Sequence, residues 1–170
     1  MDKEILECGM QKLQKGDMSA LDDIYNITSK TVYYLAYSIL KNSELAKDIM
    51  QETFIRIVAN IDKYNPNTNA SAWISCIARN LSLRQIKNLK RNVSLELFIE
   101  TDIFDYSEQW IDNLLLKKAM DILSIDERQI VMLFSIENFK HREIAQIVNK
   151  PVGTVKWIYA KAIKKLKNIY

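Results

Sequence analysis

Basic side chains gather in two blocks of the chain and could bind a polyanion. Residues 150–170 hold six bases and no acid, residues 79–91 hold five bases and no acid, and residues 92–116 hold six acids and no base. A helix that carries only bases gains nothing from internal Glu–Lys pairs. An external polyanion such as nucleic acid explains such lysines better; the helix expected after Pro151 carries Lys156, Lys161, Lys164, Lys165 and Lys167 and no carboxylate.

Catalytic chemistry has no support in the sequence. His141 is the only histidine, and the chain has no Gly-rich phosphate loop, no Cys–His pair and no HExxH motif. Acidic pairs such as Asp22-Asp23 lie at expected helix starts, where the helix dipole explains them. We expect no catalytic residue, no metal and no cofactor. We interpret Cys8 and Cys76 as reduced thiols and His141 as a surface or phosphate-facing residue.

Residues 141–156 fit a helix-turn-helix, the element that would present one basic block. Ala145 is small where two crossing helices must approach, and Asn149 tolerates the positive φ of a tight turn. Pro151 suits the first turn of a second helix, and Val155 is placed to anchor that helix. The inner face of the first helix would be formed by Ile144 and Val148.

The elements around this motif are also expected to be helices. Apolar residues recur at helical spacing, and the chain has only 3 glycines and 2 prolines. We expect a first helix over residues 3–15 stopped by Gly16, a second begun by Asp17 or Ser19 and ending near Lys41, a third from Asn42-Ser43 to about Asp62, a loop over residues 64–69, and a fourth helix capped by Ser71. Ser124 and Glu127 predict a capping box.

The charge pattern predicts an all-α chain of two small helical domains. Residues 1–91 would form the first domain and residues 110–170 the second, joined by a flexible acidic linker over residues 92–109 that holds the two basic surfaces apart. No signal peptide and no membrane-spanning run is visible, so we expect a soluble, cytoplasmic protein.

Taken together, the motifs resemble an extracytoplasmic-function (ECF, group IV) sigma factor of the sigma-70 family, the promoter-recognition subunits of bacterial RNA polymerase. The resemblance covers nearly the whole chain. It rests on Gly16-Asp17, Ala20-Leu21, Leu35-Ala36, the run from Ala46 to Phe54, Ala72-Trp73-Ile74, the run from Ile77 to Asn80, Glu143-Ile144-Ala145 and the run from Pro151 to Lys156. It implies a sigma-2 domain and a sigma-4 domain, and a mechanism of recruitment and strand opening without catalysis.

The resemblance also implies three sets of site residues. Docking on core RNA polymerase, through the largest-subunit clamp and the flap, would use Leu45, Asp48, Gln51, Glu52 and Ile55. The −10 element would be melted and read by Asn60, Tyr64, Asn65, Asn67, Asn69, Ile77 and Asn80, with Tyr64 as the aromatic wall of a pocket for an unstacked base. Its phosphates would be held by Arg79, Arg84, Lys87, Lys90 and Arg91. The −35 element would be read in the major groove by Thr154, Lys156, Trp157, Ala160, Lys161 and Lys164.

Two residues depart from the family pattern, and two other functions remain open. Ala70 stands where the family has an aromatic residue, and Trp157 stands where it has a small polar one, so the usual promoter sequence does not carry over. The family commonly has an anti-sigma factor, which we expect as a further partner. The alternatives are a stand-alone helix-turn-helix regulator, which would bind a palindrome without polymerase, and an enzyme.

Overall fold

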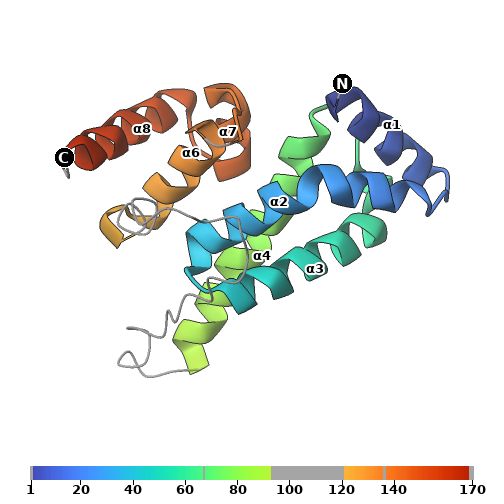
Figure 1. The fold of residues 1–170 in the computed structure, drawn as a ribbon, viewed down its shortest axis with the longest axis horizontal. Coiled ribbons are helices and arrows are strands. Elements are labelled where there is room, and N and C mark those ends of the chain that lie inside the picture. Colours follow the sequence, from blue (N-terminus) through green and yellow to red (C-terminus); the bar gives the residue numbers. More distant parts are fainter. Residues whose placement is uncertain (1, 67, 93–120, 136, 169–170) are drawn as a thin grey trace.

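A computed structural model describes residues 2–66, 68–92, 121–135 and 137–168 of the chain (Figure 1). These residues form helices joined by short loops and contain no strand, which confirms the all-α class. The predicted linker over residues 92–109 lies almost wholly outside them, so the proposed domain boundaries stay a prediction. The elements are α1 (Asp2–Gln14), α2 (Ala20–Leu40), α3 (Ser43–Ala59), the 3₁₀ helix η1 (Ile61–Lys63), α4 (Ala70–Asn92), α6 (Ile125–Ser135), α7 (His141–Val148) and α8 (Val152–Lys167).

Several predicted helix ends are found where the sequence places them. Gly16 follows α1 with a φ of +87°, a conformation that favours glycine. Asn42 caps α3, because its Oδ1 accepts from the Leu45 amide at 2.9 Å. Ser124 and Glu127 form the predicted capping box ahead of α6, with the Ser124 amide donating to Glu127 Oε2 at 2.9 Å.

Other predicted ends are wrong. The cap of α4 is Asn69 and not Ser71, since Asn69 Oδ1 accepts from the Ala72 amide at 3.0 Å. No side-chain capping bond starts α2, because the Asp17 carboxylate accepts from the amide and hydroxyl of Ser19 instead. The third helix ends at Ala59, and η1 replaces its predicted last turn. Short polar side chains such as those of Asp17, Asn69 and Ser71 can bond to more than one nearby backbone group, which explains the two wrong caps.

The helix-turn-helix prediction is confirmed in its local geometry. Asn149 ends α7 in the left-handed region with a φ of 53°, and Pro151 directly precedes α8. Ala145 and Val155 are buried, as are Ile144 and Val148 on the inner face of α7. These apolar contacts fix α8 on α7 and α6 and leave its other face to solvent.

Replacing Asn149 by valine is expected to destabilise the folded chain by about 1–2 kcal/mol, because a β-branched residue is strained at positive φ. Asn149→Gly is the matched control and should leave stability unchanged or slightly higher. Urea unfolding of the two variants measures the difference. Equal stability of the valine and glycine variants would contradict the assignment.

The N-terminal half of the chain (α1 to α4) packs directly against the C-terminal half (α6 to α8). Helix α6 lies along α2, and α7 lies against α4 (Figure 1). Buried side chains from residues 6–78 and 130–158 belong to one continuous apolar core. Burial of apolar surface brings the two halves together, while the prediction that an acidic linker holds the two basic surfaces apart stays a prediction.

No helix within the described ranges combines the length and the apolar composition that crossing a bilayer requires.

Candidate nucleic-acid interface

The outer face of α8 presents a row of basic and aromatic side chains. Val155, Ile158 and Ala162 point inward and are buried. On the opposite face Trp157 is 63% exposed, and the Lys161 ammonium lies 5.1 Å from the centre of its ring. All the residues predicted to read the −35 element are exposed: Thr154, Lys156, Trp157, Ala160, Lys161 and Lys164. Such a helix can meet phosphates and base edges at once.

Lysines outside this face have partners within the protein. Lys165 Nζ lies 2.7 Å from Oε2 of Glu127, whose side chain is buried, and Lys150 Nζ lies 3.1 Å from Asp126. Burial acts to raise the pKa of Glu127, but hydrogen bonds from Lys165 and Ser124 outweigh it and the pKa is lowered. The prediction that the lysines of α8 serve a polyanion is wrong for Lys165, which neutralises a buried carboxylate of α6.

His141, expected at the surface or facing a phosphate, is half-buried. Its ring centre lies 4.4 Å from that of Phe134 and 5.7 Å, edge-on, from that of Tyr159. The residue therefore forms part of an aromatic cluster between α6, α7 and α8, where packing explains it without a phosphate.

Tyr64 lies under the loop that precedes α4 and is only 2% exposed. Its hydroxyl donates to the Glu7 carboxylate and lies 3.5 Å from the Thr68 carbonyl, and the centre of its ring lies 5.4 Å from that of Trp73. In this arrangement the ring is not accessible to an unstacked base. Because its ring is buried and its hydroxyl is hydrogen-bonded, Tyr64 acts as a structural support for the loop.

Tyr64→Phe is expected to reduce the loss of stability at high pH. Burial and the hydrogen bond to Glu7 raise the pKa of Tyr64 from 10.0 to about 12, so the folded chain holds this proton more tightly than the unfolded chain. The stabilisation is complete below about pH 10 and is lost as the pH rises through about 12. Urea unfolding at a series of pH values between about 8 and 12 gives the free energy of unfolding as a function of pH. This free energy should fall less steeply with pH for the variant than for the unmodified chain; an equal fall for both would contradict the assignment.

The other residues predicted for the −10 element are divided between the surface and internal contacts. Asn65, Asn80, Arg84 and Lys87 are exposed, Ile77 is half-buried, and Asn67 lies outside the described residues. Asn60 is bonded locally, since its Nδ2 donates to the Arg56 carbonyl at 2.9 Å and its Oδ1 accepts from Lys63.

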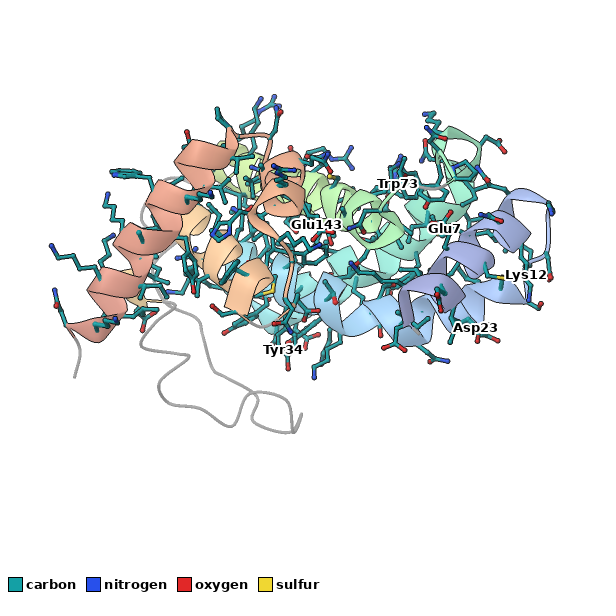
Figure 2. The ribbon with its side chains drawn as sticks, turned by 90° about the horizontal axis from the view of Figure 1, so that it is seen from above. Glu7, Lys12, Asp23, Tyr34, Trp73 and Glu143 are labelled. Atoms are coloured by element: carbon teal, nitrogen blue, oxygen red, sulfur yellow. The ribbon has the colours of Figure 1, made fainter. Side chains whose placement is uncertain are left out.

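Asn69 and Arg79 contact the C-terminal half instead of solvent. Asn69 Nδ2 donates to Glu143 Oε1 of α7 at 2.6 Å, and Arg79 Nε donates to Gln129 Oε1 of α6 at 2.8 Å. Figure 2 shows Glu143 at this junction. Burial lowers the pKa of Arg79. These two side chains of α4 and its cap are therefore covered by the half that carries the helix-turn-helix.

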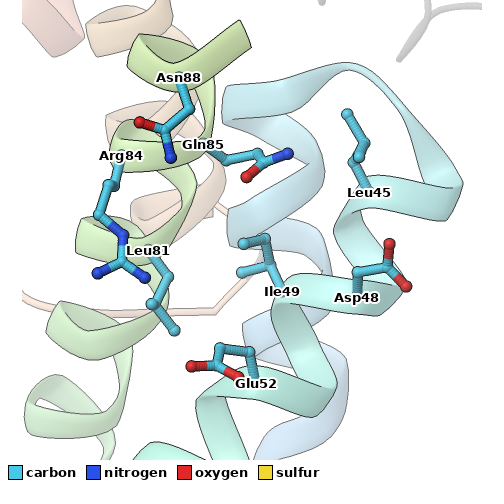
Figure 3. A pocket seen from close by; sticks show the side chains of 8 residues that line it. All are labelled: Leu45, Asp48, Ile49, Glu52, Leu81, Arg84, Gln85 and Asn88. Atoms are coloured by element: carbon cyan, nitrogen blue, oxygen red, sulfur yellow. The ribbon is translucent and has the colours of Figure 1, made fainter.

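A groove of about 290 Å³ runs between α3 and α4 on another face of the molecule. Asp48 and Glu52 lie on its α3 side and Arg84 on its α4 side (Figure 3). The groove brings together Leu45, Asp48 and Glu52 of the predicted polymerase-binding set, whereas Gln51 and Ile55 lie exposed on the same helix. Arg84, predicted to hold a promoter phosphate, lines the α4 side of the same groove. Glu52 also accepts from Arg56 Nε at 2.7 Å.

Sequence reasoning missed the polar contacts that join the halves. Arg128 is 8% exposed and donates through Nε to the Ser38 carbonyl of α2 at 2.6 Å. Thr31 donates to Glu137, and Lys41 Nζ lies 2.6 Å from Asp121. Glu127, Arg128 and Gln129 are consecutive, polar and buried. The one sequence signal for these contacts was that this polar run interrupts the apolar periodicity of the helix.

The fold and its exposed α8 define a helical DNA-binding protein of two units with a C-terminal helix-turn-helix. Residues 24–92 match the family model for Sigma-70 region 2, and residues 113–166 match that for Sigma-70 region 4. The chain is 32% identical over 162 residues to the ECF RNA polymerase sigma factor SigW of Bacillus subtilis. The aligned region covers 86% of this chain and 87% of SigW. It is 29% identical to EcfG of Rhodopseudomonas palustris, over 77% of this chain and 74% of EcfG.

Solved structures agree with this fold. The sigma factor RpoE of Bartonella quintana, in complex with the anti-sigma factor NepR, superposes with a TM-score of 0.76 at 26% identity, covering 85% of this chain and 92% of that one. CnrH, in complex with the cytosolic domain of CnrY, gives 0.70 at 17% identity, covering 97% and 96%. The chain belongs to the ECF subfamily of sigma-70 RNA polymerase sigma factors. Its function lies in transcription initiation, and sigma factors of this family regulate initiation without catalysing it.

Proposed function

We propose that this chain binds core RNA polymerase, places α8 in the −35 element and the α4 region on the −10 element, and promotes strand opening. The observation that carries the proposal is the outer face of α8. Its six predicted reading residues are all exposed and none is acidic, as expected for a helix that enters the major groove.

Polymerase docking is proposed for the exposed side of α3. Asp48, Gln51 and Ile55 are accessible there, with Ile55 62% exposed. An exposed isoleucine beside carboxylates is a suitable contact for a partner surface that is apolar at its centre and basic at its edge. The adjoining groove beside Glu52 and Arg84 would widen this contact.

Formation of the holoenzyme would have to separate the two halves. Asn69 and Arg79 are engaged by Glu143 and Gln129, so promoter DNA cannot reach them until α7 and α6 move away. We propose that the packed arrangement is the form of the free chain and that an anti-sigma factor, like NepR bound to RpoE, stabilises a form of this kind.

Reconstitution with purified core RNA polymerase tests the proposal. A template library with randomised −35 and −10 elements should yield transcripts that depend on both the chain and the core enzyme. Asp48→Lys should weaken core binding, because it reverses one charge of the docking surface, whereas Asp62→Lys on η1 is a matched control that should not. A chain that ignores the core enzyme, yet binds palindromic duplexes tightly by itself, would show a stand-alone regulator instead.

A further inference from the structure

Helix α1 makes specific polar contacts with the segment that precedes α4. Gln14 Nε2 donates to two backbone carbonyls, that of Ile61 at 3.0 Å and that of Tyr64 at 2.7 Å. A single side-chain amide thus ties η1 and the start of the loop to the end of α1. Both residues are buried. The Ile61 carbonyl also accepts from the Tyr64 amide at 3.0 Å, so the loss of Gln14 would cost most at the Tyr64 carbonyl, because an unpaired buried carbonyl is costly.

A second contact from α1 reaches the middle of the loop through Tyr64. The Glu7 carboxylate accepts from the Tyr64 hydroxyl, and Gln11 Nε2, one turn along α1, donates to the other Glu7 oxygen at 3.3 Å. The same hydroxyl contacts the Thr68 carbonyl. The Tyr64 ring is fixed in turn by Trp73 (Figure 2, where Glu7 and Trp73 lie at the same end of the bundle).

These contacts determine where the loop side chains lie. Thr68 closes a turn on Asn65, with its Oγ1 donating to the Asn65 carbonyl at 2.7 Å, and the next residue, Asn69, begins α4. Asn65 and Asn69 are therefore presented on a backbone held at Ile61, Tyr64 and Thr68. Helix α1 lies outside the region-2 match, which starts at residue 24, so the family model contains no information on this support.

We propose that Glu7 and Gln14 of α1 are positioning residues that hold the backbone at Ile61, Tyr64 and Thr68, so that Asn65 and Asn69 are placed to read an unpaired base of the −10 element. They touch no DNA themselves. The inference rests on the proposed function, and it adds that base preference in the −10 element depends on a helix remote from the promoter.

Base preference is the measurement that separates positioning from simple stabilisation. Glu7→Ala, Gln14→Leu, Tyr64→Phe and Glu7→Gln are compared with Asp2→Ala, an exposed carboxylate of the same helix, in transcription of the library with core enzyme. Glu7→Ala and Gln14→Leu should reduce the −10 base preference about tenfold, within the discrimination that one well-placed base contact provides. The −35 preference of the same molecules should not change.

Two internal comparisons make the assignment specific. Glu7→Ala combined with Tyr64→Phe should be no worse than either alone, because both remove one hydrogen bond, and Glu7→Gln should restore the preference because its amide oxygen still accepts. Hydrogen exchange at the Tyr64 and Thr68 amides should be faster in Glu7→Ala and Gln14→Leu, with the amides of α2 unchanged.

The alternatives give different results. A uniform fall in transcripts at every sequence would mean that α1 only stabilises the fold, and an unchanged −10 preference would mean that the loop holds its own shape; either overturns the inference. If the unmodified chain gives no core-dependent transcript, the proposed function fails, and this inference fails with it.

Discussion

Arg128→Ala is expected to separate the two halves of the chain and to cost about 3 kcal/mol of stability. The guanidinium is buried and donates to two carbonyls, that of Ser38 at the end of α2 and, at 2.8 Å, that of Leu123. The last carbonyls of a helix have no partner within it, so Arg128 acts as a cap for α2 that is supplied by the other half. Alanine would leave the Ser38 carbonyl buried and unpaired.

Two measurements distinguish separation of the halves from unfolding. Small-angle scattering should show a larger radius of gyration for Arg128→Ala, while circular dichroism should show that its helices persist. DNA binding by the free chain should rise by on the order of 100-fold, because weakening the packed form by about 3 kcal/mol raises the open population by that factor. Arg142→Ala, an exposed arginine of α7, is the control. An unchanged radius would show that Arg128 does not hold the halves together.

The features that the sequence predicted are those decided by near neighbours in the chain. Asn149 has to adopt positive φ because it ends one short helix just before another, and the capping box joins Ser124 and Glu127, which are three positions apart. The exposed face of α8 follows from the inward spacing of Val155 and Ile158. Local geometry is sufficient for each, so none needs the rest of the fold.

The features that sequence analysis missed depend on contacts between distant residues. Tyr64 was expected on the surface, but Glu7 and Trp73 bury it. Arg79 was expected on a phosphate, and Gln129, 50 residues away, holds it instead. Basic and aromatic side chains have the same local sequence pattern whether they are exposed on the surface or held in contacts inside the protein. Only the packing of α1 and α6 against the N-terminal bundle decides between them, and the sequence does not show how distant helices pack.

Lys161→Ala and Lys156→Ala are each expected to reduce transcription from a cognate promoter by about 5- to 150-fold, which corresponds to roughly 1–3 kcal/mol. Both ammonium groups are on the exposed face of α8. If a lysine binds a base edge, the loss is confined to promoters with its preferred base. If it binds phosphate, the loss is uniform and the salt dependence becomes shallower. Lys15→Ala, an exposed lysine just after α1 and outside both basic blocks, is the control.

Trp157 should limit the positions that the Lys161 ammonium can occupy, and therefore the DNA groups that it can contact. The ammonium lies over the indole ring, an attraction worth about 0.5–1 kcal/mol at an exposed site, so the ring restricts the lysine to fewer positions. Trp157→Ala should therefore weaken the base preference at the position that Lys161 reads, as well as any preference for thymine next to the ring. Combined with Lys161→Ala, it should cost less than the sum of the two changes. Strictly additive losses would mean that the two side chains act independently, with the indole serving DNA alone.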